Sequence, residues 1–140
     1  MGLEYEPLYD IKKVREHGGK KHIVVSADFV TTEEGTGIVH TAVMYGEDDF
    51  TLGQREHLPM VQLLEPNGTY NADAPEILQK LYIKDAEKII KRDLEERGLL
   101  YEKENNTHSY PHCYRCGTPL IYNAIVSWFV DVQSVKQKII

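Results

Sequence analysis

Three consecutive acidic residues at positions 47–49 follow a glycine turn and a segment that carries one histidine, His40. The segment GTGIVHTAVM (35–44) has the β-branched composition of a strand, and EDDFTLGQREHL (47–58) that of a short helix with an acidic first turn. Carboxylates at the start of such a helix, facing a strand that carries a histidine, can anchor a cationic amine or orient a water molecule. The same residues also fit a structural role, in which the acids cap the helix and His40 is a satisfied, half-buried side chain.

The two cysteines, Cys113 and Cys116, form a Cys-x-x-Cys motif in the Pro- and Gly-containing stretch HSYPHCYRCGTPLIY (108–122). A turn of this kind presents two thiolates to a tetrahedral zinc ion, which needs four ligands. No second pair of cysteines is present, and His112 adjoins Cys113 too closely for easy binding of the same ion. Half of a zinc site, a pair of spare buried thiols and a redox motif all remain open, although a redox motif normally begins a helix.

The composition indicates a globular chain of 140 residues, which suits one domain or part of one. No apolar run approaches the length of a membrane span, and the N-terminus lacks the order of a signal peptide. The sequence therefore predicts a soluble, intracellular protein without a membrane partner. The net charge of −6 comes from residues 1–70, so we expect any nucleic-acid contact to be local. The chain ends on apolar residues without a polar tail, which indicates that it is cut.

Helical spacing is clearest at DAEKIIKRDLEERG (85–98), where apolar residues share one face and Gly98 supplies the stop. A weaker amphipathic turn is expected at 8–17, and a tight turn at Glu65-Pro66-Asn67-Gly68. Strands are expected in five segments, namely 22–30, 35–44, 60–64, 99–104 and 124–132. Because strands and helices do not alternate regularly, we predict an α+β fold with a mostly antiparallel or barrel-like sheet and inserted helices.

Two stretches resemble a known family. ADFVTTEEGTGIVHTAVMYGEDDF (27–50) is similar to the second signature of the editing domain that is inserted in isoleucyl-tRNA synthetases. HSYPHCYRCGTPLIY, followed by Ala124 and SWFV (127–130), resembles the segment in which that insertion returns to the synthetic core. LPMVQLLEPNG and the helix at 85–98 lie between them in the same order, so the resemblance covers about residues 20–132.

The resemblance implies a fragment in two parts. Residues 1–125 would be part of the editing domain, and residues 126–140 a truncated return segment toward the synthetic core. The family's editing domain hydrolyses valyl-tRNA(Ile) in a pocket that accepts valine and excludes isoleucine, because a first binding step discriminates a single methylene poorly. The intact parent would be an ATP-dependent ligase in the cytoplasm, and this fragment alone would be poorly active or inactive.

The family pattern also assigns roles to residues of the first stretch. By resemblance, Asp49 is the catalytic residue: it binds the α-ammonium of the substrate and fixes the ester carbonyl relative to an attacking water. His40 lines the amino-acid pocket and helps to exclude the larger side chain. Thr41, Ala42 and Asp48 are the other expected substrate-binding residues.

The resemblance implies that editing needs no cofactor. Cys113 and Cys116 would be half of a zinc site whose other ligands lie outside this chain, and ATP and magnesium would be needed only by the full-length enzyme. The expected partners are the aminoacylated 3′ end of tRNA(Ile) and the rest of the synthetase. Sheet edges exposed by truncation would also permit a dimer.

The chain departs from the family at Val43-Met44-Tyr45, where the family usually continues Val-His-Thr-Ala with proline. The threonine-rich strand of the opposite pocket wall and the nucleotide-binding signatures are also absent from the sequence. Two alternatives therefore stay open. One is the equivalent editing fragment of a valyl-tRNA synthetase, which would clear threonine, and the other is a zinc-knuckle binding module without catalytic activity.

Overall fold

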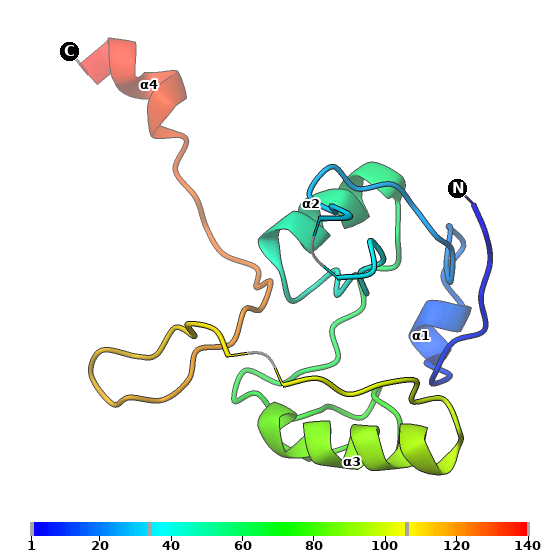
Figure 1. Cartoon of the computed structure of the whole chain (residues 1–140). Coiled ribbons are helices and arrows are strands. Elements are labelled where there is room, and N and C mark those ends of the chain that lie inside the picture. The colour runs from blue at the N-terminus through cyan, green and yellow to red at the C-terminus, as the bar shows by residue number, and fades with distance from the viewer. Residues whose placement is uncertain (1, 34, 106, 140) are drawn as a thin grey trace.

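The computed structural model describes residues 2–33, 35–105 and 107–139. Residues 1, 34, 106 and 140 lie outside the described part, so the predicted segments 1–125 and 126–140 are seen without them. The helices, in chain order, are α1 (Lys12–Arg15), α2 (Glu47–Glu56), α3 (Ile83–Glu96) and α4 (Val132–Ile139). Helices α1 to α3 lie in one body, and the chain after residue 106 extends away from it toward α4 (Figure 1). None of the helices described is long and apolar enough to cross a membrane.

The two longer predicted helices are confirmed. Helix α2 has three acidic residues in its first turn, and it ends at His57, whose φ of 56° is left-handed. Helix α3 begins two residues earlier than its sequence pattern predicts and ends before Gly98, whose φ of 68° permits the chain to reverse. Its apolar face buries Ala86 completely. The predicted turn at 8–17 contains α1, a single helical turn.

A small antiparallel arrangement precedes α3. Leu64 pairs with Tyr70 across the predicted turn, where Gly68 has a φ of 80°, and Thr69 pairs in turn with Tyr82. The backbone N–H of Tyr70 donates to the carbonyl of Leu81 at 2.9 Å. The buried core residues from this region to α3 are Leu64, Ala74, Leu78 and Ala86. The expected turn is thus confirmed, and the backbone pairing around it is antiparallel.

Among the described residues, the other segments expected as strands are unpaired or paired at single positions. Within the described ranges, Ile23 forms one antiparallel bridge with Glu4, and no continuous ladder follows it. A strand is defined by hydrogen bonds to a neighbour, so β-branched composition yields an extended segment where no neighbour is present. The α+β class with a mostly antiparallel or barrel-like sheet stays a prediction.

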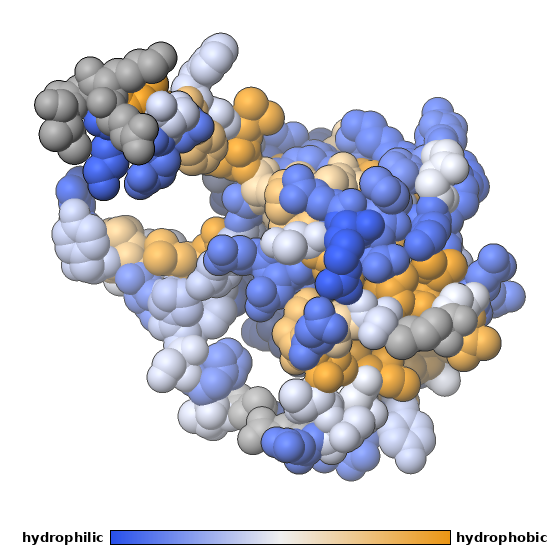
Figure 2. Space-filling view, turned by 90° about the horizontal axis from the view of Figure 1, so that it is seen from above, coloured by the Kyte–Doolittle hydropathy of each residue, from blue (hydrophilic) through white to orange (hydrophobic). Residues whose placement is uncertain are grey.

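The C-terminal arm, residues 125–139, differs from its expected form. The sequence pattern predicts a strand up to residue 132, whereas the structure begins α4 at Val132. The Asp131 carboxylate accepts a hydrogen bond from the N–H of Ser134 at 3.1 Å, as an N-cap residue does. Before this helix Val126 and Trp128 are fully exposed, at 105% and 101%. The space-filling view shows hydrophobic side chains, in orange, exposed among hydrophilic ones on the surface (Figure 2).

Candidate amine-binding site and cysteine knuckle

The turn that leads into α2 is fixed by three contacts. The N–H of Tyr45 donates to the carbonyl of Ala42 at 2.7 Å, and the carbonyl of Met44 accepts from the N–H of Ala124 at 2.9 Å. The hydroxyl of Tyr45 accepts a hydrogen bond from the backbone N–H of Leu63 at 2.7 Å. Burial raises the pKa of Tyr45 above its ordinary value. Two of the three residues that depart from the family pattern therefore join this turn to distant parts of the chain.

The third of those residues, Val43, packs directly on α2. A Cβ atom placed on Gly53 would lie only 2.3 Å from Cγ1 of Val43, so no larger residue fits at position 53 without a shift. Gly53 is buried in the middle of α2 although glycine weakens a helix. The close approach of Val43 explains the glycine, and it holds the predicted substrate segment against the helix that carries Asp48 and Asp49.

The predicted catalytic carboxylate lies in the first turn of α2. Asp49 is half-buried, and its Oδ2 lies 2.6 Å from the point where a Cβ on Gly46 would be. The carboxylate therefore folds back over Gly46, at the end of the helix where free N–H groups favour negative charge. Asp48, next to it, is exposed. The ion pairs found among the described residues include neither Asp48 nor Asp49, so both remain available to a cation.

The predicted pocket residues lie on the extended segment before the turn. His40 is exposed, whereas Thr41 and Ala42 are half-buried. The turn from Ala42 to Tyr45 separates His40 from Asp49, and the described hydrogen bonds include none between these two side chains. A purely structural role for His40 would require a half-buried side chain. The side chain is exposed instead. The structure places all five predicted site residues on the segment, the turn and the helix start, in one continuous stretch of chain.

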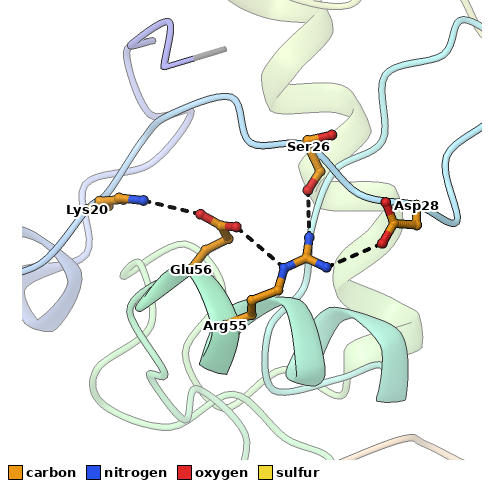
Figure 3. Close-up of polar contacts among 5 residues, drawn as sticks. All are labelled: Lys20, Ser26, Asp28, Arg55 and Glu56. Carbon is orange, nitrogen blue, oxygen red and sulfur yellow. Dashed lines mark hydrogen bonds and ion pairs between the residues drawn. The ribbon is translucent and has the colours of Figure 1, made fainter.

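A polar network at the other end of α2 holds the segment that leads toward this stretch (Figure 3). The guanidinium of Arg55 donates to the carbonyl of Ser26 at 2.9 Å and lies 3.4 Å from both Asp28 and Glu56. Lys20 forms an ion pair with Glu56 at 3.2 Å and, by its hydrogen bond, holds the pKa of Glu56 below its ordinary value. Sequence spacing gave no indication of this network, because its members are up to 36 residues apart.

The cysteines lie in a hairpin, here called the knuckle hairpin, residues 110–120. Its arms pair through an antiparallel bridge between His112 and Pro119, and the N–H of Cys113 donates to the carbonyl of Thr118 at 2.8 Å. Gly117, with a φ of 69°, reverses the chain after Cys116. The Cys-x-x-Cys motif therefore occupies a hairpin turn and does not begin a helix, which removes the geometry that a thioredoxin-like redox motif requires.

The thiols of the knuckle suit metal binding in part. Cys116 is exposed and Cys113 half-buried, so they are not a pair of spare buried thiols. The hydroxyl of Thr118, 3.2 Å from Sγ of Cys116, holds the pKa of that thiol below its ordinary value, and the neighbouring Cys113 contributes in the same direction. No group of three or more His, Cys, Asp or Glu side chains among the described residues could hold a metal ion. The Nδ1 of His112 lies 2.8 Å from the carbonyl of Tyr110. The two thiols are fewer than the four ligands of a tetrahedral zinc ion, and half of a zinc site stays a prediction.

Comparison with known proteins shows that the chain is similar to part of several isoleucine–tRNA ligases. The isoleucine–tRNA ligase of Clostridium acetobutylicum is 44% identical over 140 residues, which are 100% of this chain and 13% of that protein. The isoleucine–tRNA ligase of Bdellovibrio bacteriovorus is 42% identical over 140 residues, which are again 100% of this chain and 13% of that protein. The isoleucine–tRNA ligase of Pyrococcus abyssi is 43% identical over 129 residues, 92% of this chain and 12% of that protein. No protein-family model matches the chain.

The chain is therefore related to the tRNA ligases along its whole length. Within that class it belongs to the isoleucine–tRNA ligase family, the isoleucyl-tRNA synthetases, and it spans 13% of the length of these curated relatives.

Proposed function

We propose that this chain is part of the editing domain of an isoleucyl-tRNA synthetase and takes part in the hydrolysis of valyl-tRNA(Ile). The observation that carries the proposal is the identity of 44% across the whole chain with an isoleucine–tRNA ligase, in a stretch that includes the predicted site. The intact protein would be an ATP-dependent ligase, with ATP and magnesium bound outside this chain. Its partners would be the aminoacylated 3′ end of tRNA(Ile) and the remaining polypeptide of the synthetase.

Asp49 is the proposed anchor of the substrate. The free backbone N–H groups at a helix N-terminus favour a carboxylate there, and a carboxylate forms a charge-assisted hydrogen bond with an α-ammonium group. Its position over Gly46 supports this role, because the backbone approaches the carboxylate where any side chain would displace it. Holding the ammonium fixes the neighbouring ester carbonyl, so that a water molecule can attack in a defined orientation.

His40, Thr41, Ala42 and Asp48 are the proposed binding residues around this anchor. The exposure of His40 supports a contact with ligand, since no part of the described structure covers it. The contact of Val43 with Gly53 supports a fixed distance between the segment and the helix, as a pocket that measures side-chain size requires. Such a pocket accepts valine and excludes isoleucine by the bulk of one methylene.

The proposed division of the chain falls between residues 125 and 126. Among the described residues, the last backbone hydrogen bond to the body before the C-terminal arm runs from the N–H of Ala124 to the carbonyl of Met44, and Val126 is fully exposed. Residues 1–125 would then be the partial editing domain of α+β class, and 126–140 the return segment. Cys113 and Cys116 would supply two of four zinc ligands, and zinc would stabilise the knuckle hairpin without taking part in editing.

The test is a two-dimensional amide NMR titration of the chain with a non-hydrolysable valyl-adenosine ester mimic. We expect shifts to cluster on the stretch from His40 to Asp49 with the valyl mimic and to be absent with the isoleucyl mimic. Asp49→Asn should weaken the binding about tenfold or more, because the charged acceptor is lost. Glu47→Gln, in the same helical turn, is the matched control and should bind as the parent chain does.

Three outcomes would count against the proposal. Equal binding of both mimics would contradict the size filter, and normal binding by Asp49→Asn would contradict the anchor. A threonyl mimic that binds in preference to the valyl mimic would favour the editing fragment of a valyl-tRNA synthetase.

A further inference from the structure

The tip of the knuckle hairpin lies in a part of the chain without negative charge. The protein has 22 acidic residues, yet none occurs from residue 105 to residue 130. That stretch contains one arginine, Arg115, and two histidines, together with five of the aromatic side chains. A polyanion that approaches the knuckle hairpin therefore meets no carboxylate from this stretch of the chain, and Arg115 supplies a positive charge there.

Two residues at the tip project into solvent together. Tyr114 is 92% exposed, and Arg115 is exposed beside it. The guanidinium of Arg115 lies 5.7 Å from the centre of the Tyr114 ring and donates to its hydroxyl at 3.2 Å. The ion pairs of the described structure do not include Arg115. Its charge is therefore available, in contrast to that of Arg55 or Arg97, both of which are paired.

The base of the hairpin holds this tip in place. The hydroxyl of Tyr110 donates to the carbonyl of Leu120 at 2.7 Å, and the N–H of Leu120 donates back to the carbonyl of Pro111 at 3.0 Å. The ammonium of Lys84, from the first turn of α3, lies 4.1 Å from the centre of the Tyr110 ring. These contacts close the base of the hairpin and join it to the first turn of α3.

We propose that Tyr114 and Arg115 form a contact site for single-stranded RNA. An unpaired base stacks on the free face of the Tyr114 ring, and the guanidinium of Arg115 contacts a phosphate of the same strand. Aromatic rings that stack on bases, next to cations that follow the backbone, are the general means by which proteins bind single strands. The choice of RNA as the ligand rests on the proposed function, whereas the choice of residues rests on their exposure and charge.

The test measures the binding of a short fluorescent single-stranded oligoribonucleotide, without an amino acid attached, to the 140-residue chain by anisotropy. Tyr114→Ala should raise Kd about five- to hundredfold, since that is the usual effect of losing one stacked base. Tyr114→Trp should retain the affinity, because the ring is kept. Arg115→Gln should reduce the slope of log K against log salt by about 0.7, the contribution of one phosphate contact to a single strand.

Tyr101→Ala is the matched control, because Tyr101 is 98% exposed but is followed closely by Glu102 and Glu104. It should bind as the parent chain does. An equal loss in Tyr101→Ala, unchanged binding in Tyr114→Ala, or the absence of binding by the parent chain would each overturn the proposal. Tighter binding of the same sequence as a duplex would also overturn it, since paired bases offer no free face. The probe does not engage Asp49, so failure here and failure of the valyl-ester test are separate results.

Discussion

Val43 and Gly53 are in a contact that only glycine at position 53 allows. Cγ1 of Val43 lies 2.3 Å from the place where a Cβ on Gly53 would be, and a second methyl lies at 3.3 Å. The predicted substrate segment and the helix that carries Asp49 are held together at this point. The geometry of the candidate site therefore depends on a residue that takes no part in its chemistry.

Gly53→Ala should destabilise the chain by up to about 2 kcal/mol. Alanine improves the helix by about 1 kcal/mol, but inserting a methyl into a closed contact costs about 1–3 kcal/mol, and the second effect dominates. Urea unfolding measures the change. Val43→Ala in the same chain should recover most of the loss, since it removes the colliding methyls. Gly18→Ala is the control, because nothing lies within 4 Å of its Cβ position, and a stabilised Gly53→Ala variant would contradict the contact.

The sequence predicted those elements whose signals are local. Helices α2 and α3 followed from an acidic first turn, apolar spacing and Gly98 as a stop, and the turn at Gly68 followed from Asn-Gly. Helix α4 was missed because the β-branched and aromatic residues before it resemble a strand. Asp131, three residues before Ser134, was the available signal for its start.

The rest of the fold and of the candidate site depends on contacts between residues far apart in the sequence, which sequence spacing does not reveal. Strand composition could be recognised in 22–30, but whether a partner lies beside a segment is a property of the folded chain. In the candidate site, the positions of His40 and Asp49 followed from motif resemblance. The contacts of Tyr45 with Leu63 and of Val43 with Gly53 could not be predicted, because no local sequence pattern links those residues.

Arg55 should matter more for stability than Asp28, although the two form an ion pair. The Asp28 side chain is 94% exposed, so Asp28→Asn should change the free energy of unfolding by less than about 0.5 kcal/mol. Arg55→Ala also removes the hydrogen bond to the Ser26 carbonyl and should cost about 1 kcal/mol. Arg55→Lys should resemble the alanine variant, since one ammonium cannot reach three acceptors. Urea unfolding of the three variants decides this, and equal effects of Asp28→Asn and Arg55→Ala would be inconsistent with it.

The half-buried Tyr9 should lose its hydroxyl proton at a higher pH than an ordinary tyrosine. Its hydroxyl donates to Asp93 at 2.7 Å, and burial together with this bond raises the pKa of Tyr9 from 10.0 to about 12. The folded-state pKa of Tyr9 lies above its unfolded value of 10.0. The contact with Asp93 therefore contributes fully to the stability of the folded chain below pH 10.0, and this contribution is lost as the pH rises through about 12. Phenolate absorbance of the parent chain minus that of Tyr9→Phe isolates this titration.

Asp93→Asn provides the reciprocal test of the same contact. The hydrogen bond from Tyr9, and then that from Arg97, lowers the pKa of Asp93 below 3.8. The carboxylate therefore contributes to stability above this ordinary value, and the contribution disappears as the pH falls through the folded-state pKa. In Asp93→Asn the pKa of Tyr9 should move back toward its ordinary value. A Tyr9 difference titration that is the same in the parent chain and in Asp93→Asn would refute the contact.

Zinc should bind the chain weakly and, at high chain concentration, in a ratio of one ion to two chains. The knuckle hairpin offers two thiols, while a tetrahedral zinc ion is held tightly by four ligands. Two hairpins from different chains can supply those four. Competition with a chromophoric chelator gives the affinity, and native mass spectrometry gives the ratio. Cys113→Ser and Cys116→Ser should each abolish the binding, because either change leaves a single thiolate.

His112→Ala separates this explanation from a site completed within the chain. Nδ1 of His112 lies 2.8 Å from the Tyr110 carbonyl, so this ring is engaged with the hairpin backbone and its removal should leave the zinc affinity unchanged. A tight complex of one zinc ion per chain that is lost in His112→Ala would mean that the histidine is a ligand. The knuckle hairpin would then bind metal by itself. The hypothesis that Cys113 and Cys116 share a zinc ion with ligands outside this chain would be wrong.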